Sequence, residues 1–188
     1  MLATLCYLAD LETENLCGAY TWPAEQFGIS ISSGALPRHI SLGTPAKVKD
    51  MDAFLQVADH IADQLHVLHP VLNGKMDAKA VTSNGRNICW AGFHYHELPQ
   101  LEDARALVSK VLHENGFGFD GNDPIFGTRN LTLLTGQGDI NAFKSWASSQ
   151  EEMSEHPVCF DKLGVFFYEG ETFGEGSYFC CKRYPLAN

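Results

Sequence analysis

Three segments of the chain carry apolar residues at the spacing of an amphipathic helix. The clearest is residues 51–65, where apolar side chains recur every three or four positions and Asp50 can serve as the N-cap. A second segment opens at Pro99 and closes at Gly116, and a third follows Asp139 as its cap. The pattern therefore predicts three helices, each with one buried face.

The segment before the first of these helices is less regular. Residues 11–20 predict a short helix, whereas Trp22-Pro23 and the glycine-bearing residues 28–34 predict a loop. We therefore expect the chain to leave this helix well before it reaches Pro37.

Short apolar runs between the helices predict strands. Asn84-Gly85 favours a tight turn and separates two of these runs as a hairpin. Hairpins are too frequent, and strands too clustered, for a doubly wound parallel sheet, so we expect an α+β protein with mostly antiparallel sheets. The expected strands are residues 3–8, 38–43, 81–83, 88–95, 129–134, 158–168 and 177–183.

One short sequence occurs twice in the chain. RHISL at 38–42 returns as RNLTL at 129–133, and each copy is followed by a similar helix start, DMDAF at 50–54 and DINAF at 139–143. A strand-then-helix unit is therefore present in two copies. This repeat predicts two similar lobes within a single domain that covers residues 1–188.

Each copy of the repeat places a polar pair on a strand, two positions apart. Residues i and i+2 of a strand share a face, so His39 and Ser41 project together, as do Asn130 and Thr132. If the two lobes face each other, the two hydroxyls can hold a phosphate between them. The second copy has Asn130 where the repeat predicts a histidine.

Charge and composition narrow the class of partner. The 188 residues are 45% hydrophobic and 19% charged, which is typical of a globular protein. The net charge is −10 with only 13 Lys and Arg, and affinity for long nucleic acids grows with the number of phosphates that such residues neutralise. We therefore expect any nucleic-acid partner to be a small nucleotide or a chain end, and no long duplex.

The N-terminal segment and the cysteines indicate the compartment. The first ten residues lack the cationic and apolar parts of a signal peptide, and no segment approaches membrane-spanning length. The cysteines have no CxxC spacing, so we expect reduced, mostly buried thiols in a cytoplasmic protein. We also expect a monomer that does not bind a membrane. The six cysteines are Cys6, Cys17, Cys89, Cys159, Cys180 and Cys181.

At its two motifs the chain resembles the 2H phosphoesterase superfamily, the group of bacterial 2'-5' RNA ligases and cyclic phosphodiesterases. Members of that superfamily carry two His-x-Thr/Ser-x motifs, one in each lobe and about half a chain apart. HISL at 39–42 fits the motif fully, and NLTL at 130–133 fits except for its first residue. The order of strands and helices agrees over nearly the whole chain.

The resemblance implies a fold and a chemistry. The two lobes would surround a central cleft, with helices packed outside. One motif histidine would act as general base and the other as general acid on a 2',3'-cyclic or 2'-5'-linked phosphate, without a metal or other cofactor. His39 inherits such a catalytic role, and Ser41 and Thr132 inherit the phosphate contacts. Asn130 inherits the second catalytic position but not its chemistry, because an amide cannot shuttle a proton.

Three explanations for Asn130 follow from the residues. The first is an engineered replacement, made so that the protein binds substrate without turnover. The second is natural loss of the histidine in a protein that has become a binding protein. The third is that a water or another histidine carries the proton instead. Losing one acid–base partner commonly costs about 10²–10⁴ in rate. The expected function is therefore a metal-independent phosphodiesterase that Asn130 impairs, and the alternative is a non-catalytic nucleotide-binding protein that uses the same cleft.

Two other groups of residues offer competing chemistry. His94 and His96 stand two positions apart on a predicted strand and suggest a metal-dependent hydrolase, although a zinc site needs three or four ligands and no third is evident. One of them could also replace the missing base. Lys182 and Arg183 of the last strand are candidates for attracting phosphate, since neighbouring strand residues face opposite sides.

Overall fold

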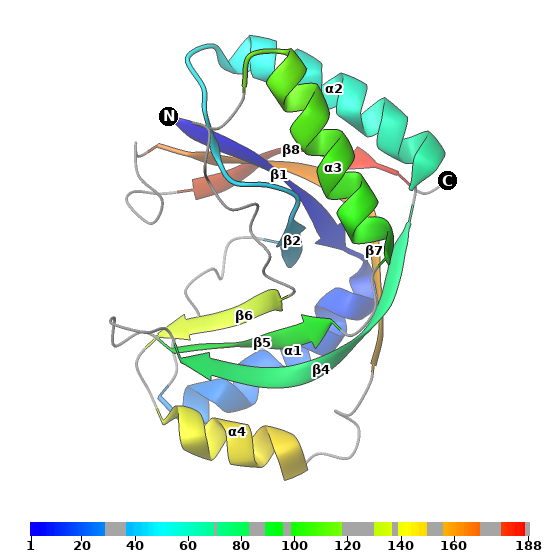
Figure 1. Cartoon of the computed structure of the whole chain (residues 1–188). Coiled ribbons are helices and arrows are strands. Elements are labelled where there is room, and N and C mark those ends of the chain that lie inside the picture. Colours follow the sequence, from blue (N-terminus) through cyan, green and yellow to red (C-terminus); the bar gives the residue numbers. More distant parts are fainter. Residues whose placement is uncertain are drawn as a thin grey trace.

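The fold was analysed in a computed structural model of the whole chain (Figure 1). It consists of four helices and eight strands within the described residues. The structure describes residues 1–28, 37–69, 71–82, 89–95, 99–117, 130–136, 139–149, 156–169 and 178–186.

Helices and strands follow one another in the mixed order expected of an α+β protein. The helices are α1 (Leu11–Gln26), α2 (Met51–Leu68), α3 (Pro99–Glu114) and α4 (Ile140–Ser149). The strands are β1 (Leu2–Ala9), β2 (His39–Ser41), β3 (Ala46–Lys47), β4 (Leu72–Thr82), β5 (Cys89–Tyr95), β6 (Asn130–Gly136), β7 (His156–Tyr168) and β8 (Tyr178–Pro185).

All the strands belong to one antiparallel sheet that β7 holds together. Its path runs β2-β1-β7-β4-β5-β6, with β3 on β1 and β8 on β7. The first part of β7, up to Phe160, pairs with β4, and the part from Phe160 to Tyr168 pairs with β1. The β7 strand therefore contributes to two groups of strands, one that ends at β2 and one that ends at β6.

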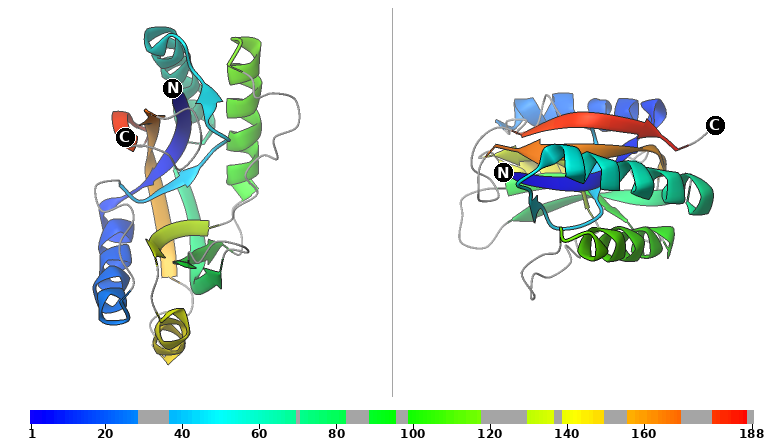
Figure 2. Two further views of the ribbon diagram at one scale, coloured as in Figure 1. Left: turned by 90° about the vertical axis from the view of Figure 1, so that its left-hand side faces the viewer. Right: turned by 90° about the horizontal axis from the view of Figure 1, so that it is seen from above.

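The two motif strands lie at opposite ends of this path and yet come close together. Figure 1 shows the sheet curving so that β6 approaches β2, and contacts between the two strands confirm this. The side view in Figure 2 shows α2 and α3 at one end of the molecule and α1 and α4 at the other. The antiparallel α+β architecture with two lobes is therefore confirmed.

Strand β1 is buried on both faces and separates two apolar clusters. Its odd-numbered residues join the larger cluster, which also holds the buried face of α2 and α3. Its even-numbered residues Leu2, Cys6 and Leu8 join a second cluster with Phe166 and Tyr168. Because side chains alternate along a strand, the second cluster lies on the face of the sheet opposite α2 and α3.

The helix ends follow the local signals in the sequence. The Asp50 side chain accepts a hydrogen bond from the Ala53 N–H at 3.1 Å, and Asp139 accepts one from Ala142 at 2.9 Å. Past α3, Gly116 has a φ of 77°, the left-handed conformation that glycine adopts at least cost. These three boundaries were predicted correctly.

Two elements are longer than the sequence pattern predicted. Helix α1 continues to Gln26 and passes through Trp22-Pro23, which we expected in a loop. Strand β4 begins at Leu72, soon after α2 ends at Leu68, whereas the sequence predicted a strand only at residues 81–83. The first part of β4 is paired with β7, from Leu72 with Phe160 to Met76 with His156, a long-range pairing that local preference does not reveal. The expected Asn84-Gly85 turn lies outside the described residues.

The cysteines are less buried than expected. Among the five whose side chains the structure describes, Cys6 and Cys17 are buried, Cys159 and Cys180 are half-buried, and Cys181 is exposed. The expectation of mostly buried thiols was therefore wrong. Within the described part of the chain, no helix combines the length and the apolar character needed to cross a membrane.

Candidate functional site

His39 is held at the start of β2 with one ring nitrogen engaged. Its Nδ1 lies 2.9 Å from the main-chain oxygen of Pro37, and its ring stacks edge-on against Phe166, with centroids 4.3 Å apart. A carbonyl oxygen only accepts hydrogen bonds, so this contact assigns the proton of a neutral ring to Nδ1. The lone pair of Nε2 then remains to accept a proton.

The surroundings of His39 keep its ring neutral at physiological pH. Burial lowers the pKa of the ring to about 4, with a smaller lowering from Arg38, while the hydrogen bond to Pro37 works in the opposite direction. Desolvation disfavours the charged imidazolium, because the ring packs on Phe166 and gives up most of its water. His39 is therefore a neutral base, ready to take up a proton.

Ser41 shares a face of β2 with His39, as the spacing predicted. Ile40 between them is buried in the larger cluster, and the Ser41 hydroxyl lies 3.9 Å from Cys6 Sγ on the face of the second cluster. Burial raises the pKa of the Cys6 thiol far above its usual range, so the sulfur stays protonated and donates. The Ser41 hydroxyl keeps its own proton for another acceptor.

A buried arginine fixes the main chain of this motif. Arg105 of α3 is 2% exposed, and its Nε and Nη2 donate to the carbonyl oxygen of Ser41 at 3.4 and 3.2 Å, while Nη1 pairs with Glu102 at 3.1 Å. Sequence reasoning missed this residue. The available signal was a charge on the apolar side of α3, at the same helical face as Leu101, Val108 and Leu112.

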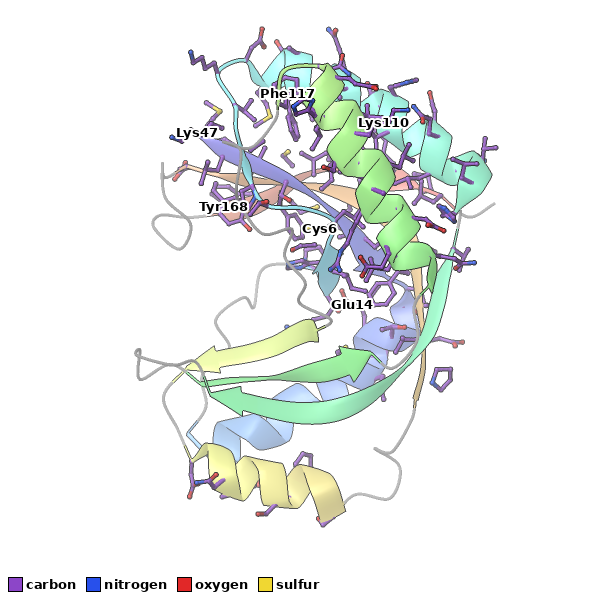
Figure 3. All side chains as sticks on the ribbon, in the orientation of Figure 1. Cys6, Glu14, Lys47, Lys110, Phe117 and Tyr168 are labelled. Carbon is purple, nitrogen blue, oxygen red and sulfur yellow. The ribbon has the colours of Figure 1, made fainter. Side chains whose placement is uncertain are left out.

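Helix α1 and strand β1 hold the other end of the motif. The Arg38 N–H donates to Glu14 at 2.6 Å, and the Ala9 N–H donates to the Arg38 carbonyl at 2.9 Å. Figure 3 shows Glu14 at the start of α1, beneath β2. The first motif therefore stands on a backbone fixed by β1, α1 and α3.

The second motif lies on β6, at the other end of the sheet path, which curves back so that β6 contacts β2. Asn130 pairs with His94 of β5, and Thr132 pairs with Gly92. Leu133 is a bulge, because the next pair joins Leu134 to Ala91. The structure thus brings the two motif strands together at the level of the backbone, with Asn130 and Thr132 at positions that share one face of β6.

The remaining candidate residues of the sequence analysis are the basic pair of β8 and the possible metal ligands. Lys182 binds Asp59 of α2 and lies over the Tyr184 ring, 4.8 Å from its centroid. This is the helix-covered face, so of the predicted pair Lys182 and Arg183 it is Arg183 that shares the face of Ser41, through the register Ser41–Cys6–Gly164–Arg183. Attraction of phosphate by Arg183 stays a prediction. Among the described residues, no group of three or more possible metal ligands occurs. His96 lies outside them.

Comparisons with known proteins bear on the fold. No protein-family model and no curated protein sequence matches the chain. Solved structures do match over nearly its full length. LigT from E. coli, solved with 3'-AMP, is 15% identical at a TM-score of 0.55, with 100% of both chains covered.

Two further structures agree. Usb1 of Kluyveromyces marxianus is 10% identical at a TM-score of 0.54, with 98% of this chain and 97% of Usb1 covered. A structure described as a phosphoesterase is 12% identical at a TM-score of 0.54 and covers 100% of this chain and 99% of its own. The chain therefore adopts the α+β fold of LigT, which is the fold expected from the resemblance of its two motifs.

Proposed function

We propose that the protein is a metal-independent phosphodiesterase whose substrate is a 2',3'-cyclic nucleotide, a 2'-5'-linked or cyclic oligonucleotide, or an RNA end. The observation that carries the proposal is the state of His39, a neutral imidazole with Nδ1 committed to Pro37 and Nε2 left to accept a proton. Ser41 stands two positions along the same strand, beside the strand that carries the second motif.

Phosphodiester hydrolysis at such a site needs a general base, a general acid and hydrogen-bond donors that bind the phosphate. His39 Nε2 takes a proton from the attacking water as a new P–O bond forms, and the bond from phosphorus to a ribose oxygen breaks. The departing oxygen takes up a proton from an acid. Ser41 and Thr132 would donate hydrogen bonds to the non-bridging oxygens, where negative charge is held through the transition state.

Nucleotide complexes of the structural neighbours support the choice of substrate class. LigT from E. coli was solved with 3'-AMP and with NADP+, and Usb1 of Kluyveromyces marxianus with uridine monophosphate. A small nucleotide also suits a chain with a net charge of −10, which would repel a long polyanion.

The experiment is a product assay on a matched set of variants. The chain, His39→Asn, Ser41→Ala and Thr132→Val are incubated with 2',3'-cyclic nucleotides, 2'-5' dinucleotides and cyclic oligonucleotides in the presence of EDTA, and products are separated by chromatography. Turnover that survives EDTA and falls by about 10²–10⁴ in His39→Asn supports the proposal. Turnover that EDTA abolishes contradicts it.

A second candidate function rests on Asn130 itself. An amide can donate a hydrogen bond to a phosphate oxygen but cannot transfer a proton, so a chain that relies on position 130 would bind a nucleotide without hydrolysing it. Calorimetry with the same nucleotides distinguishes the two functions. Binding with no product over many hours favours the binding protein, and Asn130→His should then create little activity.

A further inference from the structure

The sheet register places a histidine beside the position where the second motif lacks one. His94 of β5 is the direct partner of Asn130 of β6. On its other side, His94 is the direct partner of Asp77 in β4. Asp77, His94 and Asn130 therefore form one row across three adjacent strands. Partners in such a row stand on the same face of the sheet, with Cβ atoms about 4.5–5.5 Å apart.

The sequence of these strands indicates which face the row occupies. In β4 and β5 the partners Met76 with Tyr95 and Ala78 with Phe93 form an apolar face. The alternate positions, which include Asp77 and His94, form the opposite face. Asn130 and Thr132 belong to this second face through their partners His94 and Gly92. The row thus shares its face with both polar positions of the second motif.

We propose that His94 is the catalytic general acid of this protein, in place of the histidine that Asn130 replaces, and that Asp77 is its positioning residue. The proposal rests on the proposed function and deepens it. In this proposal the imidazole stands one strand along the row, on β5 in place of β6, and Asn130 remains in the row as the direct register partner of His94.

A carboxylate beside a histidine suits this role. An opposite charge nearby favours the imidazolium and raises its pKa, and a carboxylate that accepts from one ring nitrogen fixes the orientation of the other. The same face of β4 also carries Lys75 and Lys79, two positions from Asp77, whose charges act against the imidazolium from a diagonal distance. On β6 the same face carries Asn130 and Thr132, which have no charge. Of the charged residues on this face of β4, Asp77 is the one that pairs directly with His94.

The two histidines then divide the reaction between them. His39 removes the proton of water as oxygen attacks phosphorus. His94 gives its ring proton to the ribose oxygen as the P–O bond breaks, and one cyclic phosphodiester plus one water becomes one phosphomonoester. His39 leaves the step protonated and His94 neutral, and exchange of one proton with solvent restores both. No other co-reactant is needed.

A double replacement tests the proposal directly. His94→Asn should lower kcat by about 10²–10⁴ on 2',3'-cyclic nucleotides, because no imidazole then remains in the row. Adding Asn130→His to that variant puts an imidazole on the adjacent strand. The double variant should have a kcat at least tenfold higher than that of His94→Asn. His113→Asn, in the last turn of α3, is the matched control and should leave kcat unchanged.

Two readouts separate an acid from a residue that only supports the sheet. A nucleoside 3'-phosphate p-nitrophenyl diester has a leaving group that departs without a proton, so His94→Asn should keep most of its rate on this probe. Asp77→Asn should shift the alkaline limb of the pH–kcat profile to lower pH, because the imidazolium loses its carboxylate. Circular dichroism verifies that each variant is folded.

The possible results distinguish the role of His94 from the proposed phosphodiesterase activity. Normal kcat in His94→Asn overturns the role of His94 and leaves the proposed phosphodiesterase standing. An equal loss on the cyclic nucleotide and on the p-nitrophenyl probe also overturns it. If the unmodified chain binds nucleotides but shows no turnover, both the acid and the enzyme are wrong and the binding protein is favoured. Absence of binding refutes the shared site altogether.

Discussion

The two motif strands occupy equivalent ends of one sheet but are built differently. Strand β2 has three residues, and its backbone is fixed by neighbours from outside the sheet, Glu14 of α1 and Arg105 of α3. Strand β6 has seven residues and a bulge at Leu133, and it is placed by its pairing with β5. The first motif strand carries its own imidazole, His39, whereas the second motif strand carries Asn130 and its neighbour β5 carries His94.

This difference shows that a repeated motif need not imply a repeated division of labour. In the first half, packing against Phe166 and the bond to Pro37 prepare His39 as a neutral base. In the second half, the register pairs His94 directly with Asp77, and our proposal gives this carboxylate the role of favouring the imidazolium. A base and an acid with different environments are what a two-proton reaction needs.

The largest expected effect comes from making the first half resemble the second. His39→Asn should lower kcat by about 10²–10⁴, because an amide can keep a bond to Pro37 but cannot take up a proton. Asn130→Ala should cost less than about tenfold, the value of a single uncharged hydrogen bond. Steady-state kinetics on a 2',3'-cyclic nucleotide compares the two. Equal losses would mean that both positions serve the same purpose.

Arg105 tests whether the first motif depends on its support from α3. Arg105→Met should lower the free energy of unfolding by about 1–3 kcal/mol, because it removes two hydrogen bonds from the partly buried Ser41 carbonyl. Lys110→Met on the same helix is the control. Its pair with Glu114 is exposed on both sides at 4.0 Å, so urea titration should register at most about 0.5 kcal/mol.

The face beneath His39 is packed too tightly for one more methyl group. A Cβ at Gly164 would lie 2.8 Å from Leu8 Cδ2, and Leu8 is buried and pairs with His39 across the strands. Gly164→Ala should therefore destabilise by about 1–3 kcal/mol and lower kcat as well. The control is Gly18→Ala in α1, where nothing lies within 4 Å and the helix should gain about 0.5–1 kcal/mol.

The pH dependence of stability reports the burial of His39. In the unfolded chain its ring takes up a proton near pH 6.5, whereas in the folded protein its pKa is about 4. Between these values the unfolded state binds the extra proton, so the free energy of unfolding should fall as pH drops from about 6.5 to about 4. Urea titrations across this window should show a flatter profile for His39→Asn. An unchanged slope would place the ring in water.

The smallest effect is expected on the helix-covered face, away from both motifs. Asp59 accepts hydrogen bonds from Lys182 and from Tyr184, the latter at 2.6 Å, but its side chain is half exposed. Asp59→Asn should change stability by at most about 1 kcal/mol and leave kcat unchanged. A clear loss of activity in this variant would mean that the attachment of β8 to α2 affects the motif strands.

Short-range spacing explains why much of the fold could be predicted. The apolar face of α2, the caps Asp50 and Asp139, and the shared face of His39 and Ser41 all depend on residues within a turn or a strand of one another. The misjudged places are α1 beyond Trp22 and the first part of β4, which lack such a local signal. The first part of β4 pairs with β7, 80 residues or more further along the chain.

The sequence by itself determined the two motifs, their order and the residues that face the same side of each strand, because these follow from the geometry of a single backbone segment. Only the tertiary structure decided which segments became neighbours. Register between strands far apart in the chain put His94 between Asp77 and Asn130. The packing of α3 brought Arg105 to the Ser41 carbonyl, and the burial of His39 lowered its pKa. Such effects arise from long-range contacts, and a local pattern such as the charge on the apolar side of α3 does not name the partner.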